Sequence, residues 1–211
     1  MGIPSYFSHV IKNYSSILKN KKYLKRVDNF YLDSNSIIYD CIANINYVND
    51  QQFESEIIEN VCIKLQYYID VVSPQKKVII AFDGVAPVAK LEQQRNRRYK
   101  SLLEVEIFKA CGLNTHENSW NKTAITPGTN FMKNLNIGVK QYFNSQKIII
   151  SGSDIPGEGE HKIFDYIRKN SDIHKNQTTL IYGLDADLIM LCLNHLYLSN
   201  NIYLYRETPE F

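Results

Sequence analysis

The stretch KIIISGSDIPGEGEHKI, residues 147–163, joins a short apolar run to a segment in which two glutamates alternate with glycines. The run at 147–150 has the unbroken hydrophobic character of a strand that is buried on both faces. The glycines permit a tight turn after it, so Glu158 is predicted to lie in that turn and Glu160 in the first turn of a helix. The stretch therefore predicts a strand–turn–helix unit that places two carboxylates just beyond the strand.

Four further apolar runs of the same kind lie along the chain, at residues 29–32, 77–82, 179–182 and 202–205. Longer segments with a helical spacing of apolar residues separate them, for example at 37–45 and 57–69. This alternation predicts an α/β fold, with a mostly parallel central sheet flanked by helices. Between the second and third runs, a polar loop is expected at 114–126. Thr126 and Pro127 then predict a helix start with a threonine cap and a proline at the first helical position.

The length and composition of the chain limit its class. At 211 residues it is most simply one domain, 1–211, with a single core. The formal net charge is +2, so any binding to nucleic acid has to depend on local basic patches. The four cysteines form no CxxC pair, and we expect reduced thiols and a cytoplasmic location, with the nucleus as the alternative. No apolar run approaches the length of a membrane span, so no membrane contact is expected.

Acidic residues follow four of the apolar runs. They are Asp33, Asp83, the pair Glu158 and Glu160, and the pair Asp185 and Asp187, here called the acidic cluster. Because the carboxyl ends of parallel strands meet at one edge of a sheet, the six carboxylates are predicted to converge on one crevice. Their repulsion would be severe without cations, and Mg²⁺ prefers carboxylate oxygens. Two Mg²⁺ ions roughly 3.5–4 Å apart would clamp the attacking and leaving oxygens of a phosphodiester.

Helix capping is the alternative explanation for these acids. Asp33, Asp83 and Asp185 could each cap the helix that follows, and for any one of them alone capping is as good an explanation as metal binding. Acids at four strand ends, two of them doubled, favour the metal site. His161, beside Glu160, is interpreted as a structural or surface histidine rather than as a ligand.

A basic helix face is predicted shortly after Asp83, in the segment GVAPVAKLEQQRNRRYKS at residues 84–101. Its members fall at i, i+4, i+7 and i+8, and they are Lys90, Gln94, Arg97 and Arg98, here called the basic face. On a helix these positions lie on one side, where guanidinium, amide and ammonium groups make a good phosphate pocket. A solvated helix face is the alternative, but proximity to the acidic cluster favours a pocket for a terminal phosphate.

Several blocks of the sequence resemble the XRN family of 5′→3′ exoribonucleases, which is related to the flap-endonuclease and PIN-like nucleases. They are MGIPSYF at the start, LDSNSIIYDC around Asp33, FDGVAPVAKLEQQRNRR, ITPGTNFM, SDIPGEGEHKI and YGLDADLIML. The blocks run in order from the N-terminus to about residue 191, and PGEGEHK and AKLEQQRNRR are the most specific. The resemblance implies a PIN-like, 5′-nuclease type of α/β fold.

The resemblance also implies roles for the residues. The acidic cluster would hold Mg²⁺ or Mn²⁺, two ions in all, and the basic face would bind a 5′-monophosphate. The implied reaction is attack by a metal-activated water on single-stranded RNA with a 5′-monophosphate, releasing mononucleotides. Tyr39 stands where the family usually has a histidine that stacks on the first base, and stacking on a tyrosine is also worth about 1–3 kcal/mol. Tyr39 lies off the apolar stripe of its helix, which leaves both exposure and core packing open.

The family's catalytic region continues beyond the length of this chain and supplies one further metal-binding Asp. After Asp187 the sequence offers only the acids Glu207 and Glu210, in no matching motif. We therefore expect residues 1–211 to be the N-terminal part of a longer catalytic region, with incomplete activity, unless the chain is a minimal version of the enzyme.

Two other functions stay open at this point. One is a flap-type 5′ DNA nuclease, against which stand the basic face, suited to single-stranded ends, and the lack of a helix-hairpin-helix motif. The other is a non-catalytic RNA-binding or scaffold protein derived from the nuclease, whose usual signature would be loss of the acids. All six acids expected in this span are present. The sequence predicts no particular protein partner and no particular RNA target.

Overall fold

The computed structural model of the chain describes residues 5–20, 23–24, 26–43, 45–112 and 120–207, apart from the side chains of residues 97, 98, 101, 102, 105 and 109. Its elements, in chain order, are α1 (Tyr6–Asn13), η1 (Ser15–Ile17), β1 (Asn29–Asp33), α2 (Asn35–Ile42), α3 (Asp50–Val72), β2 (Lys77–Ala81), α4 (Val88–Ala110), η3 (Lys122–Ala124), α5 (Asn130–Tyr142), β3 (Ile148–Ser151), α6 (Gly159–Lys169), α7 (Ser171–His174), β4 (Thr179–Tyr182), α8 (Asp187–Asn194) and β5 (Ile202–Tyr205). None of the described helices combines the length and apolar character that a membrane crossing requires.

The strands form one sheet in the order β3-β2-β1-β4-β5, and all neighbouring strands are parallel. Each of the five apolar runs forms one of these strands, with boundaries within one residue of those expected. The predicted α/β class is therefore confirmed. The chain first winds outward from β1 through β2 to β3 and then continues on the other side of β1, so the winding reverses between β1 and β4.

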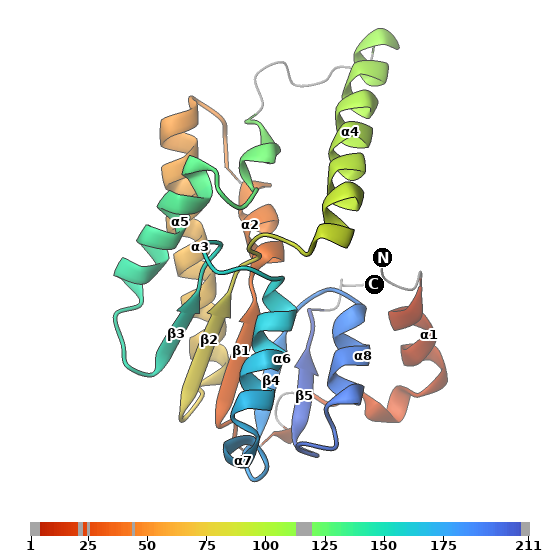
Figure 1. The fold of residues 1–211 in the computed structure, drawn as a ribbon, viewed down its shortest axis with the longest axis vertical. Helices are drawn as coiled ribbons and strands as arrows, with labels where there is room; N and C mark the ends of the chain where they lie inside the picture. Colours follow the sequence, from red (N-terminus) through yellow and green to blue (C-terminus); the bar gives the residue numbers. More distant parts are fainter. Residues whose placement is uncertain (1–4, 21–22, 25, 44, 113–119, 208–211) are drawn as a thin grey trace.

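The strands read as unbroken apolar runs because both faces of the sheet are buried. Along β1, Phe30 and Leu32 pack into a core with α2, α3 and α5, whereas Tyr31 points to a second core with α6 and α8. Figure 1 shows α6 and α8 on one face of the sheet, with α3 behind it. The helices thus cover both faces of the sheet.

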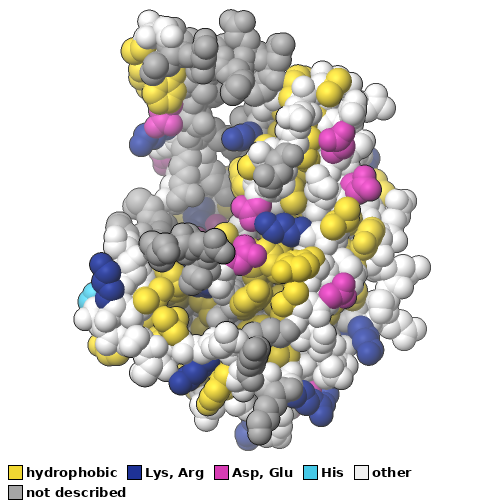
Figure 2. All heavy atoms as spheres, turned by 180° about the vertical axis from the view of Figure 1, so that it is seen from behind, with side chains coloured by type: hydrophobic (Ala, Val, Ile, Leu, Met, Phe, Trp, Pro, Cys, Tyr) yellow, Lys and Arg dark blue, Asp and Glu magenta, His cyan; other side chains and the backbone are white. Residues whose placement is uncertain are grey.

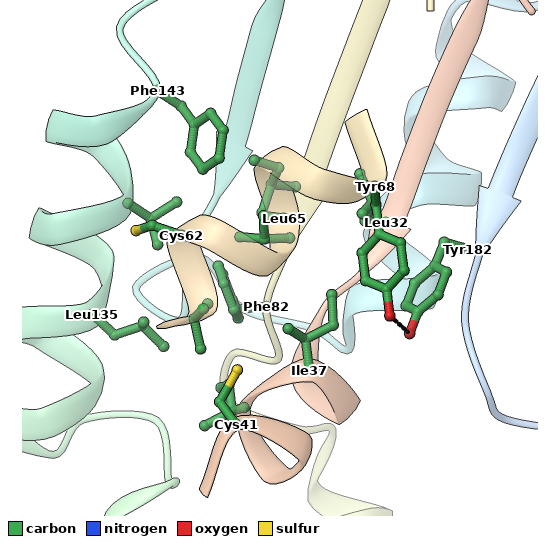
Figure 3. Close-up of a cluster of buried hydrophobic side chains, with 14 of the residues drawn as sticks. Leu32, Ile37, Cys41, Cys62, Leu65, Tyr68, Phe82, Leu135, Phe143 and Tyr182 are labelled. Atoms are coloured by element: carbon green, nitrogen blue, oxygen red, sulfur yellow. Dashed lines mark hydrogen bonds between the residues drawn. The ribbon is translucent and has the colours of Figure 1, made fainter. Parts of the chain in front are cut away.

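The larger core holds the acid-bearing strands in place against α2, α3 and α5. Leu32 of β1, Phe82 at the end of β2 and Leu65 of α3 are fully buried there and lie close together in Figure 3. At the edge of this core the Tyr182 hydroxyl donates to the Tyr68 hydroxyl over 3.2 Å. The residues immediately after β1, β2 and β4 are therefore fixed by packing just below them.

The helix start predicted at Thr126 and Pro127 is wrong by three residues. α5 begins after Thr129, whose Oγ1 accepts a hydrogen bond from the Met132 amide over 3.3 Å. Gly128, between the two threonines, has φ of +93°, a conformation that interrupts a helix. Of the polar loop expected at 114–126, residues 114–119 lie outside the described part, and η3 occupies part of the remainder.

Candidate active site at the carboxyl edge of the sheet

A cavity of about 380 Å³ hollows the carboxyl edge of the sheet. Its lining includes the whole acidic cluster together with Tyr39, Lys90 and Gln94. The other lining residues are Asn35, Ser36, Gln93 and Leu184. Residues that follow β1 and β4 face one another across it, at the point where the winding of the sheet reverses. Open parallel sheets bind their ligands at this point.

Asp33, the last residue of β1, carries a carboxylate oxygen without a protein donor. Within the described part of the chain, its buried Oδ1 has no hydrogen-bond partner. Burial, and after it the charges of Asp83 and Glu160, raise the pKa of Asp33 well above its usual range. Gly159 approaches so closely that a Cβ there would stand 2.5 Å from Asp33 Oδ1. The site thus keeps an acid in surroundings that favour its ionised form only if a cation is bound.

Asp83, at the end of β2, has donors for both carboxylate oxygens. The Gly159 amide donates to Oδ1 over 2.7 Å, and the Asn35 side-chain amide donates to Oδ2 over 2.6 Å. Asn35 in turn accepts a hydrogen bond from the Asp83 amide over 3.1 Å. Burial raises the pKa of Asp83, and the bond from Gly159 opposes this only in part. Both carboxylate oxygens of Asp83 are therefore held, one of them by the first amide of α6.

The turn before α6 has the form expected from the sequence. Glu158 directly precedes the helix and Glu160 lies in its first turn. Gly157 has φ of +101°, in the left-handed region that favours glycine. Glu160 is only 8% exposed, and burial followed by the charges of Asp185 and Glu158 raises its pKa to about 7. Holding these carboxylates together costs free energy that a bound cation would offset.

The second acidic pair belongs to the turn between β4 and α8. Asp187 is the first residue of α8, and its amide donates to Asp185 Oδ1 over 3.1 Å. The N-cap position of α8 is Ala186, so Asp185 binds the first helical amide from one residue further back, and its second oxygen can still bind a cation. The Arg206 guanidinium donates to the main-chain oxygen of Asp185 over 2.8 Å. This bond ties the turn to the end of β5.

The basic face begins at the cavity and continues along α4. Lys90 Nζ lies 2.5 Å from Glu158 Oε2. Burial opposes the protonation of Lys90, but the hydrogen bond and charge of Glu158 outweigh it and raise the pKa. Gln94 lines the cavity one turn further on. Arg97 and Arg98 are part of the same helix, but their side chains lie outside the described residues.

Lysine and arginine side chains do not gather over the far side of the molecule, as far as it is described. In Figure 2, which shows the face opposite to Figure 1, the coloured basic side chains are scattered over the surface, and some of them lie beside acidic side chains. Figure 1 shows α4 rising from the carboxyl edge as a long helix that projects beyond the sheet. With a net charge of +2, any binding of phosphate has to depend on a local patch of positive charge, and α4 carries the basic face.

Tyr39 is exposed rather than packed in the core. Tyr39 belongs to α2, is 49% exposed and lines the cavity. Of the two environments left open by the sequence, the structure thus shows the exposed one. Glu207, the nearest acid beyond Asp187 in the chain, is engaged elsewhere, because the Tyr68 hydroxyl donates to it over 2.6 Å. Glu210 lies outside the described residues.

Two residues near the acids, Asn35 and Lys162, had no assigned place in the sequence interpretation, and a third, His161, was interpreted as a structural or surface residue. Asn35 holds Asp83, as described above. Lys162 Nζ donates over 2.8 Å to the main-chain oxygens of both Phe82 and Gly152, and burial lowers its pKa to about 8. His161 is half exposed, as expected for a surface residue, but its Nε2 lies 3.5 Å from Glu158 Oε2. Their positions in the LDSNS and GEGEHK blocks are the only signal that could have pointed to them.

The donor set of the cavity fits a hard divalent cation. Carboxylate oxygens predominate, and one of them, Asp33 Oδ1, is buried without a donor among the described residues. Ligand atoms of Glu158, Glu160 and His161 also lie within 4.8 Å of one another, a separation compatible with a shared ion. The geometry therefore offers an acidic cluster that could bind metal next to a surface suited to a phosphate.

Comparison with known proteins identifies the family. The sequence profile described as XRN 5'-3' exonuclease N-terminus matches residues 1–208. The chain belongs to this family. Within it, 5'-3' exoribonuclease 1 of Saccharomyces cerevisiae is 37% identical over 216 aligned residues, which cover 92% of this chain and 14% of that protein. The human 5'-3' exoribonuclease 1 is 36% identical over 92% of this chain and 12% of its own length.

A relative from another organism gives the same result. The 5'-3' exoribonuclease 2 of Cryptococcus neoformans is 37% identical over 79% of this chain and 17% of its own length. The chain thus spans between 12% and 17% of the length of these three relatives. The matched region includes the acidic cluster and the basic face, since both lie within residues 1–208.

Proposed function

We propose that this chain is the catalytic core of a 5′→3′ exoribonuclease that degrades single-stranded RNA with a 5′-monophosphate to mononucleotides. The observation that carries the proposal is the convergence of six carboxylates, from the ends of four strands, on one cavity with Lys90 and Gln94 in its lining. The relatives described above are all named 5'-3' exoribonucleases, which supports RNA as the substrate and the 5′ end as the starting point.

The acidic cluster would hold Mg²⁺, or Mn²⁺ in its place, most simply as two ions. Bound ions would lower the pKa of an attacking water and neutralise the charge that develops on the phosphate. The chain's own contribution is to hold the ligands. Asp83 is fixed by Gly159 and Asn35, and Asp185 is fixed by the start of α8. Asp33 Oδ1 accepts no hydrogen bond from the described part of the chain, so no protein donor would compete with a metal ion for this oxygen.

The basic face would act as the stop for the 5′ end. Lys90 and Gln94 line the cavity, and Arg97 and Arg98 follow on the same helix. A 5′-phosphate bound there would place the first phosphodiester next to the acids, because Lys90 itself contacts Glu158. The exposed ring of Tyr39 would stack on the first base. Such an arrangement measures one nucleotide from the end, which is what an exonuclease requires.

The extent of the functional unit is also part of the proposal. We infer that residues 1–211 form one nuclease domain and that downstream sequence of a longer protein completes the catalytic region. The chain spans a small share of its relatives, and the described acid beyond Asp187, Glu207, is bonded to Tyr68. We place the protein in the cytoplasm, as its four free cysteines, three of them buried, suit a reducing compartment.

Digestion of end-labelled RNA tests this proposal. The chain is incubated with one RNA sequence carrying either a 5′-phosphate or a 5′-hydroxyl, and with DNA of the same sequence, in Mg²⁺, Mn²⁺ or EDTA. We expect mononucleotides from the 5′-phosphorylated RNA, more with Mn²⁺ than with Mg²⁺, and none in EDTA. Arg98→Ala should remove most of the preference for the phosphorylated end. Arg95→Ala, an exposed position of α4 outside the basic face, is the matched control and should keep it.

Each contrary result has a defined meaning. Equal rates on both RNA ends would disprove the phosphate pocket. Preferred cleavage of DNA would assign the site to a flap-type nuclease. Binding of RNA without cleavage, also when downstream sequence from the same source is restored, would make the chain a non-catalytic RNA-binding protein.

A further inference from the structure

Lys162 is the last charged residue of the PGEGEHK block, and unlike Lys169, the other lysine of α6, it does not point to solvent. Its amide donates to the Glu158 carbonyl over 3.0 Å, so it lies one helical turn beyond the acidic turn. Its ammonium donates over 2.8 Å to the carbonyl of Phe82 and over 2.8 Å to that of Gly152. One side chain therefore joins two segments that are far apart in the sequence.

The two carbonyls stand where the pairing of β2 with β3 ends. The Phe82 amide still donates to the Ser151 carbonyl over 2.9 Å, as in the ladder. Beyond this bond the segments carry Asp83 on one side and the loop to Glu158 on the other. The Lys162 ammonium thus donates hydrogen bonds to two main-chain carbonyls at the point where the hydrogen bonds between β2 and β3 end. The next link is main-chain again, since the Gly84 amide donates to the Gly157 carbonyl over 2.8 Å.

We propose that Lys162 is a positioning residue of the metal site, which fixes the end of β2 against the loop 152–158 and so sets the separation of Asp83 and Glu158. The inference rests on the proposed function, because it assumes that these carboxylates bind metal. Lys162 is not a catalytic residue in this account, since it lies behind the acids and is not part of the cavity lining. It acts through the backbone that carries them, as residues around metal ligands commonly do.

The sign of the effect separates positioning from charge alone. An ammonium close to the acids repels a cation, so loss of its charge alone would tighten metal binding. Loss of the two hydrogen bonds would instead let Asp83 and Glu158 move apart and weaken metal binding. Removal of a partner of this kind typically costs about 10–100-fold in metal affinity. The two explanations therefore predict opposite shifts in the same titration.

The experiment compares Lys162→Met with Lys169→Met, the same change on an exposed lysine of the same helix that pairs with Asp165. Thermal unfolding of the full chain is followed over a series of Mn²⁺ concentrations, because a bound ion stabilises the folded state. We expect Lys162→Met to raise the Mn²⁺ concentration for half-maximal stabilisation by about tenfold or more. On 5′-phosphorylated RNA it should lower kcat with little change in KM. Lys169→Met should leave both quantities unchanged.

An unchanged or lower Mn²⁺ midpoint in folded Lys162→Met would overturn the inference, even if the variant melts earlier in EDTA. If Lys162→Met does not fold, Lys162→Gln decides by the same criterion, since it lacks the charge and its side chain, one bond shorter than that of lysine, does not reach both carbonyls. A weaker Mn²⁺ response in the glutamine variant supports positioning, and an equal or tighter one refutes it. Absence of any Mn²⁺ stabilisation in the unmutated chain would instead reject the metal site itself, and this inference with it.

Discussion

Two aspartates at the two ends of β1 face opposite situations. Asp28, just before the strand, is 6% exposed but accepts hydrogen bonds from Arg26 over 2.9 Å and from the Thr178 amide over 3.1 Å, and it lies 3.6 Å from the Lys76 ammonium. Burial opposes its ionisation, yet these partners outweigh burial and lower its pKa. Asp33 ends the same strand and has a buried oxygen without a donor in the described chain, and its pKa is raised well above the usual range.

The difference between the two acids separates structure from function. The fold supplies cations and amides to Asp28, so this carboxylate contributes to the free energy of unfolding. At Asp33 it supplies further carboxylates and a helix end that is already occupied by Asp83. A protein keeps such an acid only where something outside the chain completes it, which is typical of functional sites. The amino edge of the sheet is thus self-sufficient, and the carboxyl edge is not.

Replacement of Asp33 should give the largest effect on activity. Asp33→Asn removes a central ligand, and we expect cleavage of 5′-phosphorylated RNA to fall by at least about a hundredfold. In EDTA at neutral pH the same variant should be more stable than the unmutated protein. The reason is that folding raises the pKa of this carboxyl group, so the free energy of unfolding falls as the pH rises above the pKa of the group in the unfolded chain. Asparagine does not ionise and avoids this loss. Urea unfolding and a single-turnover assay measure the two quantities.

Asp28→Asn is the control for this experiment, because it makes the same change at the other end of the strand. It should leave the rate per folded molecule close to that of the unmutated protein. If Asp33→Asn retains the full rate, or destabilises the protein in EDTA, the distinction between the two edges does not hold.

The strands could be read from the sequence because the sheet is buried on both faces. Phe30, Tyr31 and Leu32 point alternately into two cores, so successive residues of the strand are all apolar. An unbroken apolar run of this length is easy to recognise in the sequence. The convergence of the acids that follow these runs could then be predicted, because parallel strands bring their carboxyl ends to one edge of the sheet. The two glycines predicted the turn before α6. Residues two apart do not share a face of a helix, so Glu158 and Glu160 can bind one metal site only if Glu158 lies in the turn and Glu160 in the helix.

The partners of the acids could not be read in the same way. Asn35 and Gly159 meet Asp83 across 48 and 76 residues of sequence. Lys162 binds main-chain carbonyls, which every residue possesses, so no pattern marks them. The helix start at Thr129 was missed for a related reason. Thr126 with Pro127 satisfies the local rules equally well, and the turn at Gly128 decides between them.

Replacement of Asp28 should reveal the strength of the self-sufficient edge. We expect Asp28→Asn to lower the free energy of unfolding by about 0.5–1.5 kcal/mol at neutral pH, because it weakens the hydrogen bonds of the buried carboxylate, whereas Arg26 and Lys76 are exposed enough for water to replace their partner. The lowered pKa fixes the pH dependence of this difference. The contribution of the carboxylate is present above the unfolded pKa of about 3.9 and is lost as the pH falls through the lower folded value. Urea titrations at neutral pH and in acid compare the two proteins, and an equal difference at both would show that the ion pairs contribute nothing.

The smallest effect on stability is expected at His174, whose two ring nitrogens both have hydrogen-bond partners within the chain. Its Nδ1 lies 2.7 Å from the Asn170 carbonyl and therefore donates to it, which leaves Nε2 to accept from the Tyr31 hydroxyl over 2.7 Å. This arrangement requires a neutral ring, and burial lowers the pKa. A histidine whose pKa is depressed on folding contributes stability above its unfolded pKa of about 6.5, and that stability is lost as the pH falls below it.

The test compares the unmutated protein with His174→Asn in EDTA, by urea unfolding at several pH values between 5 and 8. Glu160, with a pKa raised to about 7, gives a slope of opposite sign in both proteins, so only the difference between them reports on His174. We expect the advantage of the unmutated protein to shrink as the pH falls from 7 to 5. A difference that stays constant over this range would mean that His174 binds a proton as readily in the folded chain as in the unfolded one. The amino edge would then contain a buried group that the fold leaves free to titrate, and the contrast with Asp33 would be one of degree.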